Sequence, residues 1–81
     1  MELTAQDIIT DDLLNCEFTA RKGSNAYTHA KDRKVYIIDF KRDIENGKEK
    51  IIVSICFDKP NQSSSLAWFN ATDLIFVKKI L

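Results

Sequence analysis

The amino-acid sequence predicts a mainly β protein of the α+β class. We expect about five short antiparallel strands in one small curled sheet or barrel, together with a short N-terminal helix. Two apolar runs flank an Asn-Gly dipeptide in mid-chain, an aromatic segment precedes a short polar turn near the end, and only residues 4–15 show helical spacing. At 81 residues the chain has room for one domain with a modest core, so residues 1–81 are expected to form a single domain.

The first expected element is a helix over residues 4–15. Thr4 followed three residues later by Asp7 has the spacing of a capping box. Four apolar side chains then recur at helical spacing: Ile8, Ile9, Leu13 and Leu14. The sequence therefore predicts an amphipathic helix with its apolar side towards the sheet.

The same segment is acidic, since no basic residue occurs before Arg21. Early carboxylates suit the positive end of a helix dipole, which makes a solvated and well-capped helix the simpler interpretation. The alternative is an acidic face that docks on a basic partner, formed by Asp7, Asp11, Asp12 and Glu17.

An antiparallel sheet is expected over residues 17–81, and residues 17–20 are its first strand. Gly23-Ser24-Asn25 is typical of a turn, and the following segment to Lys34 is polar. A further strand through Tyr27-Thr28-His29 is the alternative to an irregular loop there.

The central hairpin, residues 35–57, carries the strongest pattern in the chain. Asn46-Gly47 tolerates positive φ at both central positions of a type I′ turn, whose twist matches two antiparallel strands. Such a turn places Glu45 opposite Lys48 and Asp43 opposite Lys50, giving two charge pairs of opposite sign.

Uninterrupted pairing from that turn stacks Tyr36 on Phe57, Ile38 on Ile55 and Phe40 on Val53, which brings the apolar residues onto one face of the hairpin. This face is expected to be the main core wall: Tyr36, Ile38, Phe40, Ile51, Val53, Ile55 and Phe57. The other face mixes Ile37, Ile52 and Cys56 with polar residues, which implies a second, partial cover from a curled sheet or from the N-terminal helix.

After a turn-rich link, the chain is expected to form a strand over residues 65–69, a tight or 3₁₀ turn over 70–73, and a final strand over 74–81. Trp68 and Phe69 are adjacent in the first of these strands, so they must point to opposite faces. One of them is exposed unless the N-terminal helix covers it, and an exposed aromatic is the natural anchor for a partner.

The ending AWFNATDLIFVKKIL resembles the last third of Src-homology-3-like small β-barrels, and the resemblance extends over about residues 34–81. It is a likeness of shape that identifies no specific family. It implies about five short strands, a central hairpin and a one-turn 3₁₀ link before the last strand. The chain lacks the Ala-Leu-Tyr-Asp-Tyr motif and the tandem Trp of the proline-peptide groove. The resemblance therefore does not imply recognition of proline-rich peptides.

The N-terminal stretch has neither the basic start nor the apolar run of a signal peptide, and no apolar stretch approaches the length of a membrane span. We therefore expect a cytoplasmic protein with no membrane partner. Cys16 and Cys56 lie far apart without the paired spacing of a zinc site, so two free core thiols are expected rather than a disulfide.

Few residues offer catalytic chemistry. His29 is the single histidine and lies in a polar segment, so no second histidine can complete a metal site. The sequence has no phosphate-binding Gly-rich loop, and its carboxylates are scattered rather than paired. We therefore predict a non-catalytic protein without a metal or cofactor.

Two functional hypotheses remain. The first is a protein-binding module, a small bacterial or phage accessory, immunity or inhibitor-type protein that docks on a larger protein partner. Its candidate binding residues are Arg21, Lys22, Tyr27, Lys31, Arg33, Lys34, Trp68 and Phe69.

The alternative is a nucleic-acid-binding small barrel that uses the basic loop over residues 21–34, together with Lys41 and Arg42. Twelve basic residues are balanced by twelve acidic ones, which counts against a phosphate-binding surface. Self-association through the edge of the terminal strand is a third hypothesis. The sequence names neither the partner nor the oligomeric state.

Overall fold

A computed structural model of the protein describes residues 3–60 and 68–80. Its strands form one antiparallel sheet in the order β4-β3-β2-β1-β5. The strands are β1 (Cys16–Ala20), β2 (Val35–Glu45), β3 (Lys48–Phe57), β4 (Phe69–Asn70) and β5 (Leu74–Lys79). The mainly β prediction and the five strands are confirmed. The sheet is open between β4 and β5, so of the two expected forms the curled sheet is confirmed and the barrel is wrong.

The N-terminal segment differs from the expected single helix over residues 4–15. Two 3₁₀ helices replace it, η1 (Ala5–Asp7) and η2 (Thr10–Asn15), because the backbone at Ile8 and Ile9 is extended. The predicted capping pair is present, since the Thr4 N–H donates to the Asp7 carboxylate at 3.0 Å. An extended joint between two short turns lets both Ala5 and Leu13 reach the core.

The expected strand through Tyr27-Thr28-His29 is also wrong, because this segment belongs to the α-helix α1 (Asn25–Ala30). Ser24 caps the helix, accepting the Tyr27 N–H on its hydroxyl oxygen at 3.2 Å. Ala26 and Ala30 lie one turn apart and are both buried in the core. The helix ends at Lys31, whose φ of 53° turns the chain away.

The β2–β3 hairpin keeps the predicted register near its turn. Asn46 and Gly47 have φ values of 53° and 77°, and Glu45 pairs with Lys48. The register continues to Asp39 opposite Ser54, after which a β-bulge at Ile38 shifts it by one residue.

Beyond the bulge, the predicted pairs Tyr36–Phe57 and Ile38–Ile55 are wrong. Val35 pairs with Phe57, and Ile37 pairs with Ile55. The extra residue at the bulge rotates β2, so Val35 and Ile37 enter the core while Ile38 is only half-buried. Most of the predicted core wall is retained, including Phe40 on β2, while Val35 and Ile37 take the places of Tyr36 and Ile38.

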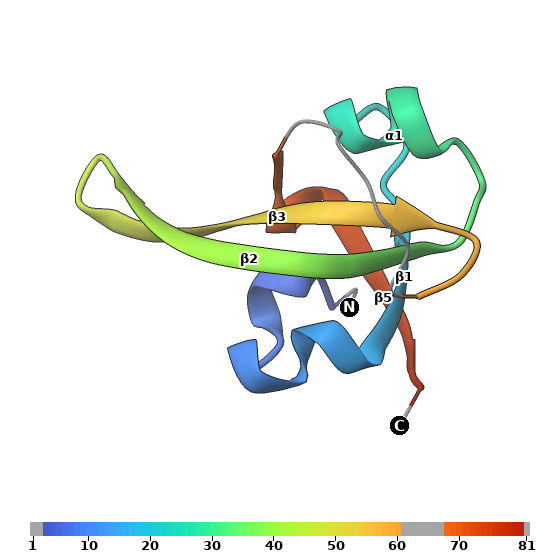
Figure 1. Ribbon diagram of the computed structural model, residues 1–81. Helices are drawn as coiled ribbons and strands as arrows, with labels where there is room; N and C mark the ends of the chain where they lie inside the picture. The colour runs from blue at the N-terminus through green and yellow to red at the C-terminus, as the bar shows by residue number, and fades with distance from the viewer. Residues whose placement is uncertain (1–2, 61–67, 81) are drawn as a thin grey trace.

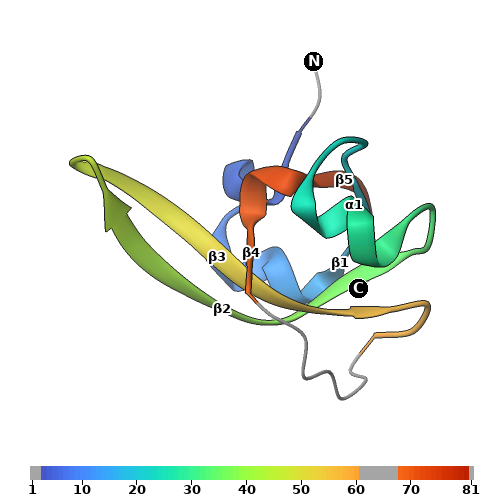
Figure 2. The ribbon, with the colours of Figure 1, turned by 90° about the horizontal axis from the view of Figure 1, so that it is seen from above.

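The distal part of this hairpin projects from the rest of the molecule (Figure 2), and we call residues 41–50 the arm. All of residues 41–49 are exposed. Asp43 lies opposite Lys50 and Glu45 opposite Lys48, as predicted, but the close ion pairs are diagonal: Lys50 with Glu45 at 2.6 Å and Arg42 with Glu49 at 3.2 Å. Long side chains reach diagonal neighbours in a twisted two-stranded ribbon as easily as direct ones.

The C-terminal part follows the prediction closely. The expected strand over 65–69 falls largely outside the described residues, and β4 pairs Phe69 with Val53. The 3₁₀ helix η3 (Ala71–Asp73) leads directly into β5, which pairs with β1. Leu3 covers part of the outer edge of β5, where its carbonyl accepts the Phe76 N–H at 2.7 Å.

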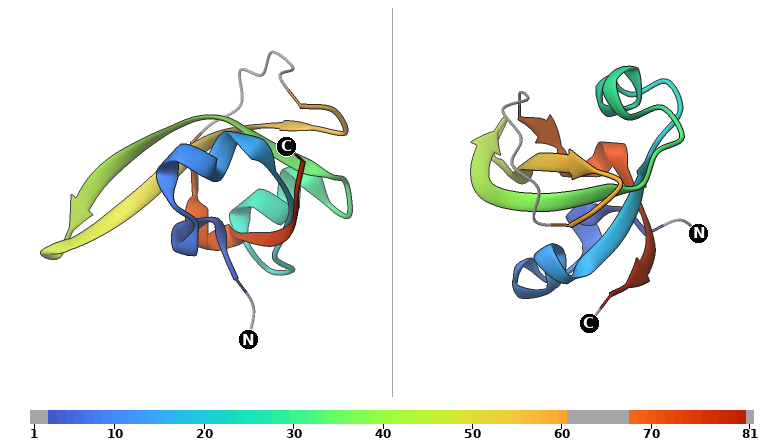
Figure 3. Two further views of the ribbon diagram at one scale, coloured as in Figure 1. Left: turned by 90° about the horizontal axis from the view of Figure 1, so that it is seen from below. Right: turned by 45° about the vertical axis from the view of Figure 1, so that its right-hand side comes forward.

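The core lies on one face of the curled sheet. Figure 1 shows α1 on one side of the hairpin and the N-terminal 3₁₀ helices on the other, and Figure 3 shows the same arrangement from below and from the side. The fully buried larger side chains include Phe18, Phe69, Leu13, Ile55 and Leu74. Cys16 and Cys56 are buried and free, as predicted. None of the described helices has the length and apolar character that a bilayer-spanning segment requires.

Candidate binding surfaces

Trp68 immediately precedes β4, and its side chain lies on the sheet face opposite the core. Its neighbour Phe69 is 2% exposed and packs in the core, with its ring 5.3 Å from the ring of His29. Trp68 itself is 40% exposed. The two aromatic side chains therefore point to opposite faces, as their adjacency in sequence requires.

A cation lies against the exposed indole. The ammonium of Lys41, on β2, is 4.6 Å from the centre of the Trp68 ring. Lys41 pairs across the hairpin with half-buried Ile52, and Ile52 pairs with Asn70, which lies two residues after Trp68 and so on the same face. Strands β2 and β3 and the residue that precedes β4 therefore build one outward surface, which we call the indole patch: Trp68, Lys41 and Ile52. A cation over an indole face is attractive by about 0.5–1 kcal/mol at an exposed site.

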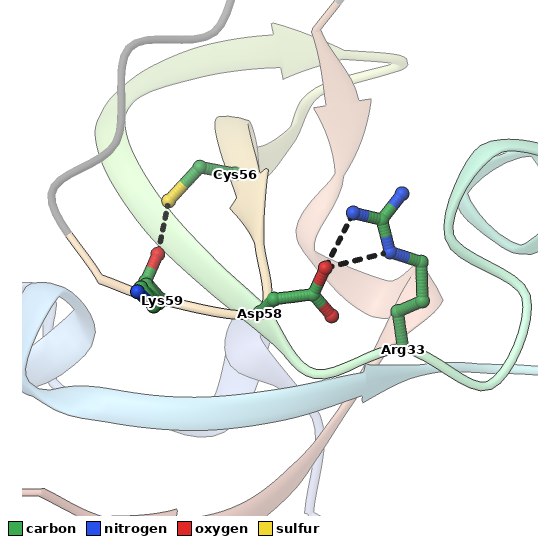
Figure 4. Close-up of polar contacts among 4 residues, drawn as sticks. All are labelled: Arg33, Cys56, Asp58 and Lys59. Carbon is green, nitrogen blue, oxygen red and sulfur yellow. Dashed lines mark hydrogen bonds and ion pairs between the residues drawn. The ribbon is translucent and has the colours of Figure 1, made fainter.

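The basic residues predicted from the sequence do not all remain available. Arg21, Lys22, Lys31 and Lys34 are exposed. Arg33 is held in place instead: its Nε donates to the Asp58 carboxylate at 3.0 Å, and a second guanidinium nitrogen donates to the same oxygen (Figure 4).

The Arg33 guanidinium also lies 4.8 Å from the centre of the Phe57 ring. Its hydrogen bonds hold the pKa of the Asp58 carboxyl below the ordinary value. These contacts join the end of β3 to the segment before β2, where the Asp58 N–H donates to the Lys34 carbonyl at 2.9 Å. Arg33 therefore has a structural role.

The aromatic residues of the basic segment are poorly placed for stacking on bases. Tyr27 is half-buried, packs against the core and donates its hydroxyl to Asp32 at 3.4 Å. Tyr36 is 6% exposed and donates to the Glu17 carboxyl at 3.1 Å. Neither ring offers the open face that binding single-stranded nucleic acid needs.

The acidic candidates are also dispersed. Asp11 is exposed. The Asp7 carboxylate accepts the N–H of Thr4, the N-cap of its own 3₁₀ helix. The Asp12 carboxylate forms an ion pair with the Lys79 ammonium at 3.4 Å. Glu17 is 6% exposed and belongs to β1, so it cannot contribute to an outward acidic face. Two of the four predicted carboxylates therefore have roles inside the fold, and a third is paired.

The thiols and the histidine show no catalytic arrangement. Burial raises the pKa of the Cys16 thiol, and nearby Asp12 raises it further. Cys16 donates to the Asp12 carbonyl at 3.2 Å, and Cys56 donates to the Lys59 carbonyl at 3.3 Å (Figure 4). Within residues 3–60 and 68–80, no group of three or more His, Cys, Asp or Glu side chains could hold a metal ion.

A pocket of about 330 Å³ lies beside the outer edge of β3, between the arm and Asn70. Its carboxylates, Glu45 and Glu49, are paired with Lys50 and Arg42. The Gln6 side-chain oxygen accepts the Ile51 N–H at 3.0 Å there, which covers an otherwise free strand edge. These groups stabilise the base of the arm.

Sequence reasoning found Trp68 and missed the arm as a surface. Ile44, on the arm, is 75% exposed, the highest exposure among the large hydrophobic side chains of the described residues. The sequence contained an indication of this exposure, since Ile44 is flanked by Asp43 and Glu45 close to the two-residue turn of a long hairpin. No protein-family model, curated protein or solved structure matches the chain.

Proposed function

We propose that this protein is a non-catalytic binding module that docks on a larger protein partner through the indole patch. The observation that carries the proposal is the exposed Trp68 side chain with the Lys41 ammonium 4.6 Å from its ring. Tryptophan is enriched among the residues that dominate binding energy, because it buries a large rigid surface on contact.

The strands of the patch support this role. Trp68 is tied to the core through Phe69, its buried neighbour, and Lys41 and Ile52 lie on paired strands. A partner would therefore meet a surface that loses little conformational entropy on binding. A small protein of this kind acts by occupying a surface of its partner, as an accessory, immunity or inhibitor-type protein of bacteria or phages would.

The nucleic-acid alternative has less support. Arg33 is bound to Asp58, and Tyr27 and Tyr36 are engaged with carboxylates. The remaining cations of the basic loop are exposed, but the chain as a whole carries as many acidic as basic residues and has a formal net charge of zero. Such a chain does not attract phosphates strongly.

The test is an affinity capture from lysate of the native host, followed by titration of the captured partner. We expect wild-type protein to retain a specific protein and Trp68→Ala to bind it about thirtyfold more weakly, which corresponds to roughly 2 kcal/mol. Val77→Ala is the matched control, since Val77 is a similarly exposed apolar residue on β5, 45% exposed.

Equal capture by wild type and Trp68→Ala would refute the role of the indole patch. Salt-dependent binding of mixed-sequence oligonucleotides, without capture of any protein, would replace the proposal by the nucleic-acid alternative.

A further inference from the structure

The arm leaves the outer edge of β2 unpaired. Within the described residues, β1 pairs with β2 only at Phe18 opposite Val35, so residues 40–45 have β3 on one side and no strand on the other. The N–H groups of Phe40 and Ile44 point to this open side, since they donate to the side chains of Asp39 and Asp43 at 2.9 Å. The main chain of Arg42, midway between them, has the same orientation.

This edge is complementary to itself. If two copies pair antiparallel about a two-fold axis at Arg42, Phe40 lies opposite the partner's Ile44, and Lys41 lies opposite the partner's Asp43. Each contact occurs twice by symmetry. Shifting the register by two residues in either direction would place Lys41 or Asp43 opposite its own copy, which like-charge repulsion disfavours.

In each like-charged pair that this register brings together, at least one charge is already compensated within its own chain. Arg42 meets its own copy at the axis, but each Arg42 is paired with Glu49 of the same chain at 3.2 Å. Asp39 would face the partner's Glu45, which is paired with Lys50 at 2.6 Å. Lys41 and the partner's Asp43, in contrast, are directly opposed charges of opposite sign.

A further strand paired with the arm would also stabilise it. A two-stranded ribbon is marginally stable in water, and three or more strands with an apolar contact are needed for independent stability. Ile44 is 75% exposed, and half-buried Phe40 lies on the same open edge. Antiparallel pairing would cover both side chains and make one four-stranded ribbon from two arms.

We propose that two copies of this chain associate through the β2 edges of their arms, in the register centred on Arg42. Asp39 and Asp43 cover the outward N–H groups in the monomer. On pairing, these N–H groups bind the partner's carbonyls, and Asp43 binds the partner's Lys41 instead. Because hydrogen bonds to the partner replace hydrogen bonds to Asp39 and Asp43, the net gain is small, and we expect a reversible, concentration-dependent dimer. This proposal shares Lys41 with the indole patch, but it uses the main-chain edge of β2 and does not require a partner docked on Trp68.

The first experiment measures molar mass by light scattering and sedimentation, from low micromolar to near-millimolar protein. We expect the mass to rise from the monomer value of 9.3 kDa towards twice that value. A monomer throughout this range would overturn the proposal and would assign to Asp39 and Asp43 the role of keeping the edge unpaired.

The second experiment uses charge exchange. Lys41→Asp places Asp opposite Asp, and Asp43→Lys places Lys opposite Lys, so each variant alone should dissociate about tenfold or more readily. Mixing the two variants restores opposite charges at both positions, so the mixture should form a heterodimer. Lys22→Asp and Asp11→Lys, exposed sites outside the arm, are the matched controls and should behave as wild type. A dimer that survives both single exchanges would overturn this register.

A proline pair tests whether the main chain makes the contact. Arg42→Pro removes an N–H from the open edge of β2, whereas Glu49→Pro removes the equivalent outward N–H from β3, and neither donor serves the hairpin. We expect Arg42→Pro to abolish the dimer and Glu49→Pro to retain it. Circular dichroism checks that both variants keep the sheet. Equal behaviour of the two variants would contradict pairing through β2.

Discussion

At the scale of single residues, the buried contact between Tyr36 and Glu17 shows how this small core accommodates polar groups. Tyr36 on β2 donates its hydroxyl to the Glu17 carboxyl on β1 at 3.1 Å, and both residues are 6% exposed. Every buried side-chain nitrogen or oxygen in the described part of the chain has a hydrogen-bond partner. Loss of one partner here leaves the other unsatisfied in a region that water reaches poorly.

Tyr36→Phe should therefore lower the free energy of unfolding by about 1–3 kcal/mol, since it leaves the Glu17 carboxyl without its donor. Tyr27→Phe is the matched control, because the Tyr27 hydroxyl makes only an exposed contact of 3.4 Å with Asp32. Its effect should stay within about 0.5 kcal/mol. Urea denaturation of the two variants measures the difference, and equal destabilisation would contradict a special role for Tyr36.

The same residue predicts the response to alkaline pH. Burial, and then the hydrogen bond to Glu17, raise the pKa of Tyr36 above its ordinary value of 10.0. Because the unfolded chain releases this proton first, the stability contributed by neutral Tyr36 is complete below pH 10 and is lost as the pH rises through the folded-state pKa. Urea titrations from about pH 8 to about pH 11 should show a shallower decline for Tyr36→Phe than for wild type. Parallel declines would contradict this assignment.

At the scale of elements, the N-terminal segment shows how packing selects between helix types. Leu13 and Leu14 are adjacent in η2, yet Leu13 is 0% exposed and Leu14 is 44% exposed. A single long helix would present Ile8, Ile9, Leu13 and Leu14 along one side. The two short 3₁₀ turns instead select Leu13 and leave Ile9 in solvent.

Leu13→Ala should therefore cost about 2–5 kcal/mol of unfolding free energy, through lost burial and the cavity it leaves. Leu14→Ala is the control with the same change of side chain, and it should cost less than about 0.5 kcal/mol. Chemical denaturation monitored by Trp68 fluorescence measures both variants. Similar losses for the two would contradict the way η2 packs on the sheet.

The bulge at Ile38 shows the limit of pattern reasoning for strands. The alternation of apolar residues from Asp39 to the turn agrees with the hairpin register, and the same alternation beyond it points to the wrong face. A bulge changes which residues are buried without changing the composition of the strand. Its position is selected because Val35 and Ile37 pack in the core and Tyr36 reaches Glu17.

At the scale of the whole molecule, charges contribute more to surface character than to stability. The formal net charge is zero, and the ion pairs found in the described residues all have substantially exposed side chains, as in Arg42–Glu49 at 61% and 57%. Exposed pairs are worth roughly 0–1 kcal/mol each and are screened by salt. The apolar core therefore dominates the unfolding free energy.

Raising sodium chloride from low salt to about 0.5 M should change the unfolding free energy by about 1 kcal/mol or less. Thermal and urea denaturation at the two salt concentrations measure this change. Arg33→Gln is a useful companion variant, since it removes the ion pair with Asp58 while keeping a hydrogen-bonding side chain of moderate length. A fall of several kcal/mol in the unfolding free energy at the higher salt concentration would show that ion pairs, rather than the apolar core, dominate stability.

The sequence by itself determined the features that depend on neighbouring residues in the chain. Positive φ at Asn46 and Gly47 set the hairpin turn and its nearby register, and adjacency placed Trp68 and Phe69 on opposite faces. The η3 turn before β5 was predictable for the same reason. In each case the conformational preference is local, so no distant contact is needed to select it.

Only the tertiary structure decided the features in which distant segments compete for one small core. The bulge at Ile38, the two N-terminal 3₁₀ helices and the burial of Glu17 beneath Tyr36 are of this kind. The α1 helix is an intermediate case, since the Ser24 cap is a local signal while burial of Ala26 and Ala30 against the sheet stabilises the turn. A six-residue helix is too short to be stable in isolation, so its packing, rather than its propensity, selects it.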